Sequence, residues 1–563
     1  MSIFEPYSLS SAIELAAALT RELISALKAD TERLAATERP EADVSGGIAQ
    51  TLYSTRDQAL SRLQEMSAVI QPSPAEWQAL RQLQKLDTEL MQATLDNKIA
   101  REPENMELRY HRAVVLSHLG RNQEAQGDFL AVLTRQPDHF GALNDFGNML
   151  FDSGFTSAAN TLYRHAVQTH PHQAMGHLNL ANLLQAQGEY REAKQHFTLA
   201  LDLDPALSEA HQGLSYAHAG LGELEEAERS RDLGFNGHPL ASWPYRGSGA
   251  PIGLLILCSA RGGNIPIKHL IDDRVFQANL LFAEYFPADA ALPAHQLILN
   301  SIGDADLCPE GLARAEILLA KTSAPVLNPP QSVALTGRLA NAERLGRLPG
   351  VITPKSVILP RGVLLQTHLA FDLLRSHGIA FPLLLRSPGY HTGQYFLCAE
   401  TAESLPICVS DLPGEMLLVM EMLDARNRQG DFHKYRVMFV DGAPYPLHLA
   451  LSKHWKVHYF TADMDGQPEA QRLESAFLND MPSVLGAKAM AGLENICRTL
   501  QLDYAGIDFA IDSNDNLLLF EANATMLVPR PEDEEWSRYR REAVGRIRDA
   551  VGVMLLERCS TRI

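Results

Sequence analysis

Three oxygen-bearing side chains near the end of the sequence have a spacing that suits a divalent cation. Asp508 lies in the apolar segment 504–512, and Glu521 and Asn523 lie two residues apart in segment 517–525. The turn-forming residues between these segments predict a pair of strands, and side chains two apart on a strand project from one face. Two carboxylates and an amide oxygen are hard ligands that suit Mg²⁺, with Mn²⁺ as an alternative. Acids at strand ends are often simply solvated, but Glu521 follows four apolar residues, where an unpartnered charge would be costly.

This Asp-x12-Glu-x-Asn pattern resembles that of the ATP-grasp superfamily, and the resemblance extends over residues 251–530. Four further segments follow one another in the order found in the family. Residues 326–345 are similar to its entry segment, and residues 381–394 to its glycine-rich phosphate loop. Residues 417–423 are similar to the hinge strand that contacts adenine, and residues 434–442 to the strand with a phosphate-facing Arg. The chain is most similar to the glutathione synthetase and ribosomal-protein glutamate ligase branch. The resemblance implies an α+β ATP-grasp domain over residues 331–563, with a C-terminal helix, that binds ATP and Mg²⁺.

The resemblance also implies which residues bind the triphosphate. Gly389 and Gly393 would let the backbone amides of the loop approach it, while Arg386 and Arg436 would supply positive charge. Many relatives place Lys where this chain has Arg338 and Arg386. Because Arg keeps the charge and offers a bidentate fork, nucleotide binding should survive the replacement. For Arg338 the alternative is an exposed helix residue without a role in binding.

The hinge strand is the expected adenine site, with the base against the backbone of Glu421, Met422 and Leu423. In the reaction that the family implies, a carboxylate attacks the γ-phosphate to give an acylphosphate, and an amine then displaces phosphate to leave an amide. The enzyme positions the reactants and neutralises charge. The sequence does not specify which carboxylate or which amine reacts.

The segment 448–459 is rich in cations and imidazoles and is expected on the acceptor side of the site. Lys453, His454 or Lys456 could hold a carboxylate or act as a base, and Lys453 and His454 are the candidates placed in the site with Arg436. A solvated surface loop is equally consistent with this composition, since His and Lys are common on surfaces.

Short apolar runs predict an α/β lobe over residues 251–330, preceded by a Gly-, Pro- and Ser-rich linker over 241–250. The runs 252–259, 296–300 and 324–328 are typical of buried parallel strands. Ligands of open α/β sheets bind at the carboxyl ends of strands, so the polar turns there are candidate substrate contacts. These turn residues are Arg261, Gly262, Gly263, Asn264, Asn300, Asp304 and Asn328. The two glycines are equally consistent with simple turn formation.

The first half of the chain repeats with a period of 34 residues. Three registers keep this period: Pro103, Pro137, Pro171, Pro205 and Pro239; Gly120, Gly154, Gly188 and Gly222; Ala125, Ala159, Ala193 and Ala227. The pattern resembles the tetratricopeptide repeat, a helix-turn-helix unit that stacks into an all-α superhelix. Units are expected to start near Met106, Phe140, Ala174 and Ser208. The array is predicted over 72–240, with a degenerate unit at 72–105 and a helical cap over 1–71.

The concave face of the superhelix is expected to present Asn144, Asp145, Asn148, Asn179 and Asn182. An amide both donates and accepts hydrogen bonds, so this ladder of side chains could hold an extended peptide or protein segment. The alternative is a structural surface, or one through which the protein forms homo-oligomers.

Composition limits the classes of partner and the compartment. The formal net charge of −19, without a cluster of Lys and Arg, argues against nucleic acid. No run approaches the length of a membrane span, and the amphipathic pattern over 13–27 is not that of a signal peptide. Six widely spaced cysteines indicate reduced thiols in a cytoplasmic protein.

We therefore expect a multidomain, cytoplasmic, Mg-ATP-dependent carboxylate:amine ligase whose repeat array docks a peptide, protein or carrier-bound substrate. The alternative is an interaction scaffold whose nucleotide-binding domain acts as a switch or is catalytically decayed. Arg in place of both Lys residues supports the scaffold, whereas the intact metal-binding triad argues against decay. A phosphotransferase is a third option, but the sequence shows no phospho-His domain.

Overall fold

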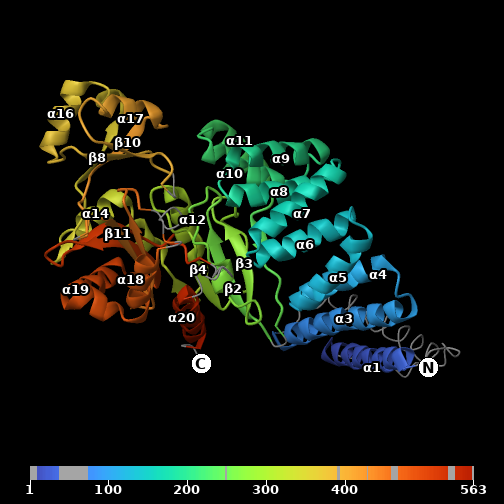
Figure 1. Cartoon of the computed structure of the whole chain (residues 1–563). Helices are drawn as coiled ribbons and strands as arrows, with labels where there is room; N and C mark the ends of the chain where they lie inside the picture. Colours follow the sequence, from blue (N-terminus) through green and yellow to red (C-terminus); the bar gives the residue numbers. More distant parts are fainter. Residues whose placement is uncertain are drawn as a thin grey trace. The chain divides into compact units, whose positions relative to one another are not determined.

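The computed structural model describes residues 9–36, 74–247, 250–389, 393–427, 429–457, 464, 467–529 and 539–560. The chain forms two compact units. The first comprises Met1–Ala210, Pro244–Ile252 and Asp273–Gln277, and the second comprises His211–Trp243, Gly253–Asp272 and Ala278–Ile563. Figure 1 shows consecutive helices in the N-terminal part and mixed sheets with helices in the C-terminal part.

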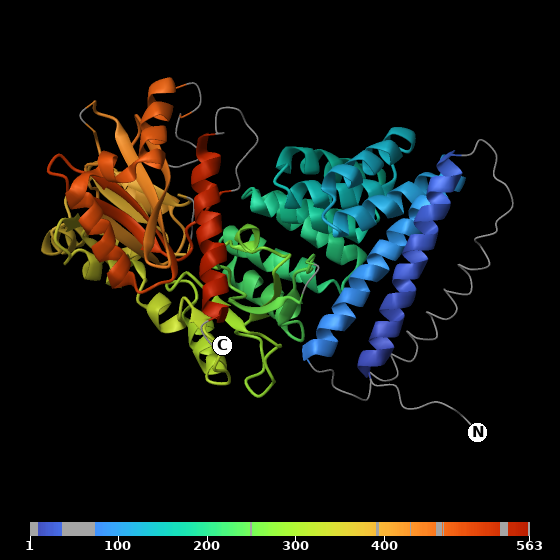
Figure 2. The same cartoon turned by 90° about the horizontal axis from the view of Figure 1, so that it is seen from below.

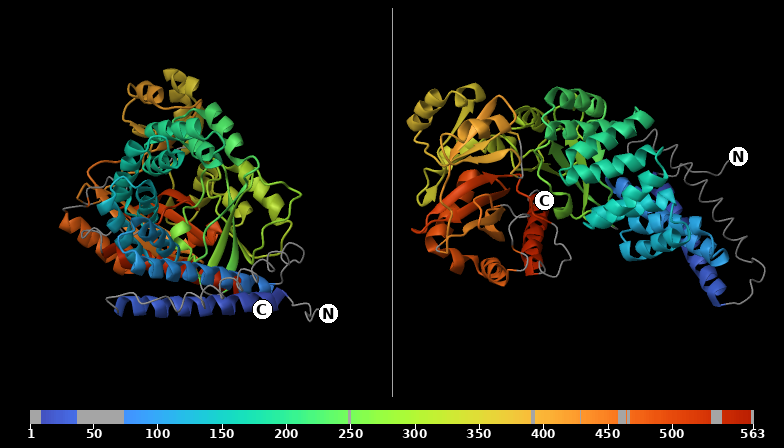
Figure 3. Two further views of the ribbon diagram at one scale, coloured as in Figure 1. Left: turned by 90° about the vertical axis from the view of Figure 1, so that its right-hand side faces the viewer. Right: turned by 45° about the horizontal axis from the view of Figure 1, so that its top comes forward.

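Four helical hairpins follow the 34-residue period. They are α4 (Met106–His118) with α5 (Asn122–Arg135), α6 (Phe140–Asp152) with α7 (Thr156–Thr169), α8 (Ala174–Ala186) with α9 (Tyr190–Leu203), and α10 (Ser208–Gly220) with α11 (Leu224–Phe235). The first helix of each pair begins at the predicted residue. The repeated glycines lie in the turns with positive φ, for example +90° at Gly154, which L-residues rarely adopt. The hairpins of the first unit stack side by side (Figure 3).

The predicted degenerate repeat at 72–105 is wrong. The residues form one continuous helix, α3 (Pro74–Arg101), because the segment contains no glycine to end a first helix. It packs along a second long helix, α1 (Leu9–Ala36), through Leu23, Ile24, Leu90 and Ala93 (Figure 2). Residues 37–71 of the predicted cap lie outside the described residues.

The last hairpin departs from the repeat pattern at Arg231, and the structure gives the reason. In the other units the equivalent side chains are the buried aromatics Phe129, Tyr163 and Phe197. Arg231 is also buried, but its Nε donates to the carbonyl oxygen of Ala260, 3.2 Å away, in the turn after the strand Ile252–Cys258 of the α/β lobe. The residue therefore replaces packing within the array by a hydrogen bond to the next domain.

The α/β lobe is a five-stranded sheet in the order β1-β3-β2-β4-β5. Its strands are β1 (Leu240–Ser242), β2 (Ile252–Cys258), β3 (Phe276–Phe282), β4 (Leu297–Asn300) and β5 (Val326–Leu327), with the short helix η1 (Lys268–Leu270) and α12 (Pro309–Leu319) between them. β2, β4 and β5 run parallel, as predicted. Two strands were not predicted, namely β3 and the edge strand β1, which pairs antiparallel with it. β1 has three residues, all exposed, and contains no apolar run that would indicate a strand.

Two of the polar turn residues of the lobe have a structural use. Asn300 and Asn328 are fully buried, and Asn300 Nδ2 donates to the carbonyl oxygen of Asn328 at 2.9 Å. Asn328 in turn exchanges two hydrogen bonds with the backbone of Tyr504, at 2.8 and 2.9 Å. These amides hold the lobe to the following domain and are not candidates for contact with substrate.

The rest of the second unit contains two sheets. A four-stranded antiparallel sheet has the order β7-β10-β8-β9, and a five-stranded sheet has the order β12-β11-β13-β14-β6. The strands are β6 (Val351–Ile352), β7 (Ser356–Pro360), β8 (Leu383–Arg386), β9 (Phe396–Ala399), β10 (Met416–Glu421), β11 (Phe432–Val440), β12 (Ala443–Ser452), β13 (Tyr504–Ile511) and β14 (Leu517–Asn523). The helices are α13 (Pro330–Ala334), α14 (Arg338–Leu345), α15 (Arg361–Leu364), α16 (Thr367–Ser376), α17 (Leu405–Asp411), α18 (Pro468–Asn479), α19 (Met481–Leu500) and α20 (Arg541–Ser560).

Each sheet has its own apolar core. Leu374 of α16 and Val409 of α17 pack on Leu385 and Leu417 of the four-stranded sheet. The helices α18, α19 and α20 pack on the five-stranded sheet. Because helices cover one face of each sheet, the opposite faces remain available to line a site between them.

Candidate active site

A cavity of about 300 Å³ is lined by residues of both sheets. Leu384 and Met420 come from the four-stranded sheet, and Arg436, Asp508 and Glu521 come from the five-stranded sheet. A cavity of this size is at the lower end of the range for small-molecule sites. Most of the residues predicted from the sequence to bind nucleotide or metal line it, namely Arg338, Arg386, Gly393, Glu421, Met422, Leu423, Arg436, Asp508, Glu521 and Asn523.

Asp508 and Glu521 lie directly opposite each other on the antiparallel strands β13 and β14. Asp508 is buried, and both of its oxygens accept hydrogen bonds from Arg436, at 2.6 and 2.8 Å, while Lys434 Nζ lies 2.9 Å from Oδ2. Burial would raise the pKa of Asp508, but the charges of Arg436 and Lys434 and the hydrogen bonds from Arg436 outweigh burial and hold that pKa well below its usual range. Asp508 is therefore ionised at neutral pH.

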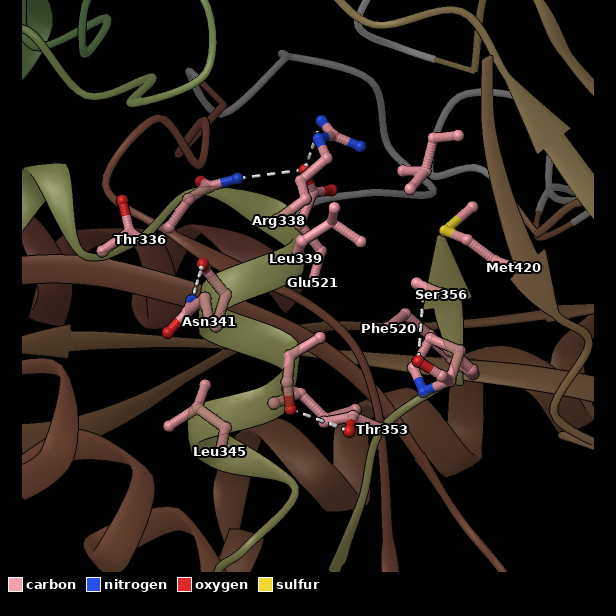
Figure 4. Close-up of a pocket in the computed structure, with 16 residues that line it drawn as sticks. Thr336, Arg338, Leu339, Asn341, Leu345, Thr353, Ser356, Met420, Phe520 and Glu521 are labelled. Carbon is pink, nitrogen blue, oxygen red and sulfur yellow. Dashed lines mark hydrogen bonds and ion pairs between the residues drawn. The ribbon is translucent and has the colours of Figure 1, made fainter. Parts of the chain in front are cut away.

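Glu521 meets a different cation. Its Oε1 accepts from Arg338 at 2.9 Å, a contact that Figure 4 shows as a dashed line, and from Asn523 Nδ2 at 3.0 Å. The oxygen of Asn523 accepts from the backbone and hydroxyl of Thr525, both at 3.0 Å. Arg338 begins α14, and its backbone N–H donates to Asp306 at 2.9 Å. The alternative of an exposed helix residue does not fit this geometry, since the side chain of Arg338 is 27% exposed and its guanidinium reaches the carboxylate of Glu521.

Arg386 and the glycines lie at the end of the β8–β9 hairpin. Arg386 is 9% exposed, and its guanidinium carbon lies 5.8 Å from the centre of the Phe396 ring. Burial, reinforced by the charge of Arg338, lowers the pKa of Arg386 to about 10. Gly389 and Gly393 have φ of +83° and +74°. Gly389 does not line the cavity, whereas Gly393 does.

The hinge residues Glu421, Met422 and Leu423 line the cavity on the side of the four-stranded sheet. The backbone N–H of Glu421 donates to the carbonyl oxygen of Lys355 at 2.8 Å, and its carboxylate accepts from the N–H of Lys355 at 3.2 Å. Of the three residues proposed to meet adenine, Glu421 therefore already uses its amide within the protein. Phe520, which was not among the predicted site residues, adds an apolar wall.

Two of the predicted catalytic residues do not reach the cavity. Lys453 is 77% exposed and forms an ion pair with Asp431, and His454 is exposed. Neither lines the cavity, whereas Trp455 and Lys456 do. The composition of this basic loop could not distinguish its members, because the direction of each side chain depends on how the loop leaves β12.

Lys434, which was not among the predicted site residues, also lines the cavity. It lies two residues before Arg436 on β11, so both side chains project from the same face toward Asp508. That spacing was visible in the sequence. Across the ladder from Arg436 lies His448, which is 1% exposed; burial and then the charge of Arg436 hold the pKa of His448 well below its usual range. His448 is therefore neutral and adds no further charge to the site.

The oxygen atoms of Asp508, Glu521 and Asn523 are of the kind that binds a divalent cation. Among the described residues, no group of three His, Cys, Asp or Glu side chains is placed to hold a metal ion. An ion here would depend on the two carboxylates, with Asn523 as the third oxygen donor, which is the hard donor set that Mg²⁺ prefers. Asn523 presents its nitrogen to Glu521 in this structure, so its amide would have to rotate to offer the oxygen.

Comparison with known proteins identifies the repeat. Residues 174–207 match the family model of the tetratricopeptide repeat. These residues are the third hairpin, α8 and α9. No curated protein matches the sequence. Among the described helices, none combines the length and apolar character needed to cross a bilayer.

Several solved structures are similar to parts of the chain. A RimK domain ATP-grasp protein from Sphaerobacter thermophilus is 16% identical, with a TM-score of 0.33 over 54% of this chain and 99% of that one. A crystal structure of MamA is 17% identical, with a TM-score of 0.25 over 27% of this chain and 90% of that one. MamA from Desulfovibrio magneticus is 21% identical, with a TM-score of 0.24 over 29% of this chain and 93% of that one.

Proposed function

We propose that the protein is a Mg-ATP-dependent carboxylate:amine ligase. The observation that supports this most strongly is the charge of the cavity. Five cationic side chains line it against three carboxylates, although the whole chain has a net charge of −19. The cations are Arg338, Arg386, Lys434, Arg436 and Lys456. A recess with an excess of positive charge on an acidic protein attracts a polyanion such as a nucleoside triphosphate.

The cavity divides into regions that suit the parts of ATP. Met420, Met422, Leu423 and Phe520 provide apolar surface for adenine at the hinge. Arg386 and Gly393 lie at the end of the β8–β9 hairpin, where cations and backbone N–H groups would bind the phosphates. This arrangement agrees with the resemblance of the sequence to ATP-grasp proteins.

Asp508, Glu521 and Asn523 would hold the divalent ion, which when bound screens charge between the phosphate oxygens and these ligands. In the proposed reaction the substrate carboxylate forms a bond to the γ-phosphorus as the bond to the β,γ-bridging oxygen breaks, and ADP leaves. An amine then bonds to the acyl carbon, phosphate leaves, and the amine loses a proton. Arg436 and Arg386, which line the cavity, would stabilise negative charge on the transferred phosphoryl group.

The repeat array is proposed to dock a peptide, protein or carrier-bound substrate, since tetratricopeptide repeats present extended concave surfaces. Part of the amide ladder has an internal role. Asn179 Nδ2 donates to Asn144 at 2.8 Å, and Asn148 accepts from the buried Tyr163 hydroxyl at 2.7 Å. Asn182 is exposed and is the residue of the ladder best placed to meet a partner.

The experiment that tests the function measures phosphate release from ATP across a panel of amino acids and small peptides, with mass spectrometry of the products. A ligase gives ADP, phosphate and a product whose mass is the sum of the two substrate masses less one water. Binding of ATP without a condensation product under any pairing would instead favour the interaction scaffold with a nucleotide switch. Absence of ATP binding would contradict both.

A further inference from the structure

Lys456 reaches the glycine-containing loop from a different element. It lies in the loop after β12, and its Nζ donates to the carbonyl oxygen of Phe396 at 3.3 Å. The Trp455 ring packs edge-on against Phe396, with ring centroids 5.3 Å apart. A Cβ at Gly393 would lie 2.9 Å from Cε of Lys456, so the glycine makes room for the lysine stem. These contacts place the ammonium beside the loop.

The same end of the hairpin already holds a cation. Arg386 pairs with Phe396 in the β8–β9 ladder, and its guanidinium lies over the Phe396 ring. Burial and the nearby charge of Arg386 lower the pKa of Lys456. Two cations held close together in a partly buried site repel each other, and an anion that binds between them relieves that repulsion.

The distance from the hinge indicates which part of a nucleotide lies there. Cys398 Sγ lies 3.9 Å from Sδ of the hinge residue Met422, and Cys398 pairs with Leu384. Phe396 and Arg386 lie two residues further along the same two strands, which is about 7 Å at the rise of a β-strand. A nucleotide with its base at the hinge would extend its phosphates toward this end of the hairpin.

We propose that Lys456 binds the terminal phosphates of the nucleotide, together with Arg386. The proposal rests on the proposed function and adds to it a phosphate ligand from the loop after β12. An ammonium with three donors on a flexible stem suits phosphate oxygens that move as a phosphoryl group is transferred. Lys456 would then act as a direct contact of the β- and γ-phosphates, and Lys453 and His454 would stay outside the site.

The test compares the affinities of ATP, ADP and AMP, with Mg²⁺, for the full-length protein and its variants by calorimetry. Lys456→Gln should weaken the affinities for ATP and ADP by about 10- to 100-fold, which is the effect of losing a hydrogen bond to a charged group. The affinity for AMP should stay within about threefold of the wild-type value. Lys456→Arg should retain most of the affinity for ATP. Lys456→Met keeps the stem against Gly393 and serves as a second variant without charge.

Lys488→Gln is the matched control, since it removes one exposed Lys that donates to the carbonyl oxygen of Asn514 away from the cavity. It should leave all three affinities unchanged. Unchanged ATP affinity in Lys456→Gln, or an equal loss for AMP, would overturn the role of Lys456 and leave the proposed function in place. A wild-type protein that binds none of the three nucleotides would overturn both.

Discussion

Asp508 and Glu521 face each other across the β13–β14 ladder, yet each is held by a different cation. Arg436 and Lys434 bind Asp508, and Arg338 binds Glu521. Like charges directly opposite on paired strands are destabilising. The cations offset this repulsion here, and a divalent ion would do so in the proposed complex. The pair is therefore the point where stability and function depend on the same charges.

Replacing Glu521 should abolish metal binding without unfolding the protein. Glu521→Gln keeps an oxygen that can accept from Arg338 but loses the charge that a divalent ion needs. We expect Mg²⁺-dependent ATP turnover to be abolished and the circular dichroism spectrum to be unchanged. Glu343→Gln, at an exposed ion pair with Arg347, is the control. Normal turnover in Glu521→Gln would refute the metal assignment.

Replacing Asp508 should destabilise the protein. Asp508→Ala leaves Arg436 and Lys434 without their carboxylate in a buried site, which typically costs about 3–5 kcal/mol. Asp441→Ala removes a half-exposed partner of Arg558, for which the expected cost is about 0–1 kcal/mol. Urea denaturation followed by circular dichroism gives both values. Equal losses would show that the buried ion cluster contributes no more than a surface pair.

A histidine pair is expected to make the repeat array sensitive to acid. The Nδ1 atoms of His177 and His196 lie 3.0 Å apart. Burial and then His177 lower the pKa of His196, with Arg164 acting in the same direction and Glu192 opposing it. Because the folded state favours the neutral ring, stability is full above the unfolded pKa of about 6.5 and falls as the pH decreases below it.

The melting temperature measured from pH 7.5 to 5.5 tests this coupling. His196→Gln should make the melting temperature depend less on pH than in the wild type, while His165→Gln, at a more exposed His, should not. An unchanged pH dependence in His196→Gln would assign the acid sensitivity to other groups.

The amide ladder separates into structural and exposed members. Asn148→Ala leaves the hydroxyl of Tyr163, a residue that is 1% exposed, without its acceptor, at an expected cost of about 1–3 kcal/mol. Asn182→Ala should leave the melting temperature within about 1 °C of the wild-type value. If the array docks substrate, Asn182→Ala raises KM for a tethered substrate with little change in kcat. A fall in kcat alone would contradict docking through this face.

The repeats could be predicted from the amino-acid sequence. A period of 34 residues places glycine in each turn and alanine where helices cross, and these are local requirements of backbone conformation and close packing. The helices therefore begin at the predicted residues Met106, Phe140, Ala174 and Ser208. The strands with Asp508 and Glu521 could be predicted in the same way, because two short apolar segments joined by a short turn specify a hairpin.

Which charged side chains share the cavity could not be predicted and depends on how the strands, helices and loops pack. Lys453 and Lys456 are three residues apart in one loop, but one points to solvent and the other contacts the glycine loop, 60 residues away in sequence. Arg338 reaches Glu521 across 183 residues. Such contacts depend on how separate elements pack, and residue type and spacing contain no information about that direction. The same reason explains why Arg231 replaced an aromatic residue in the last repeat.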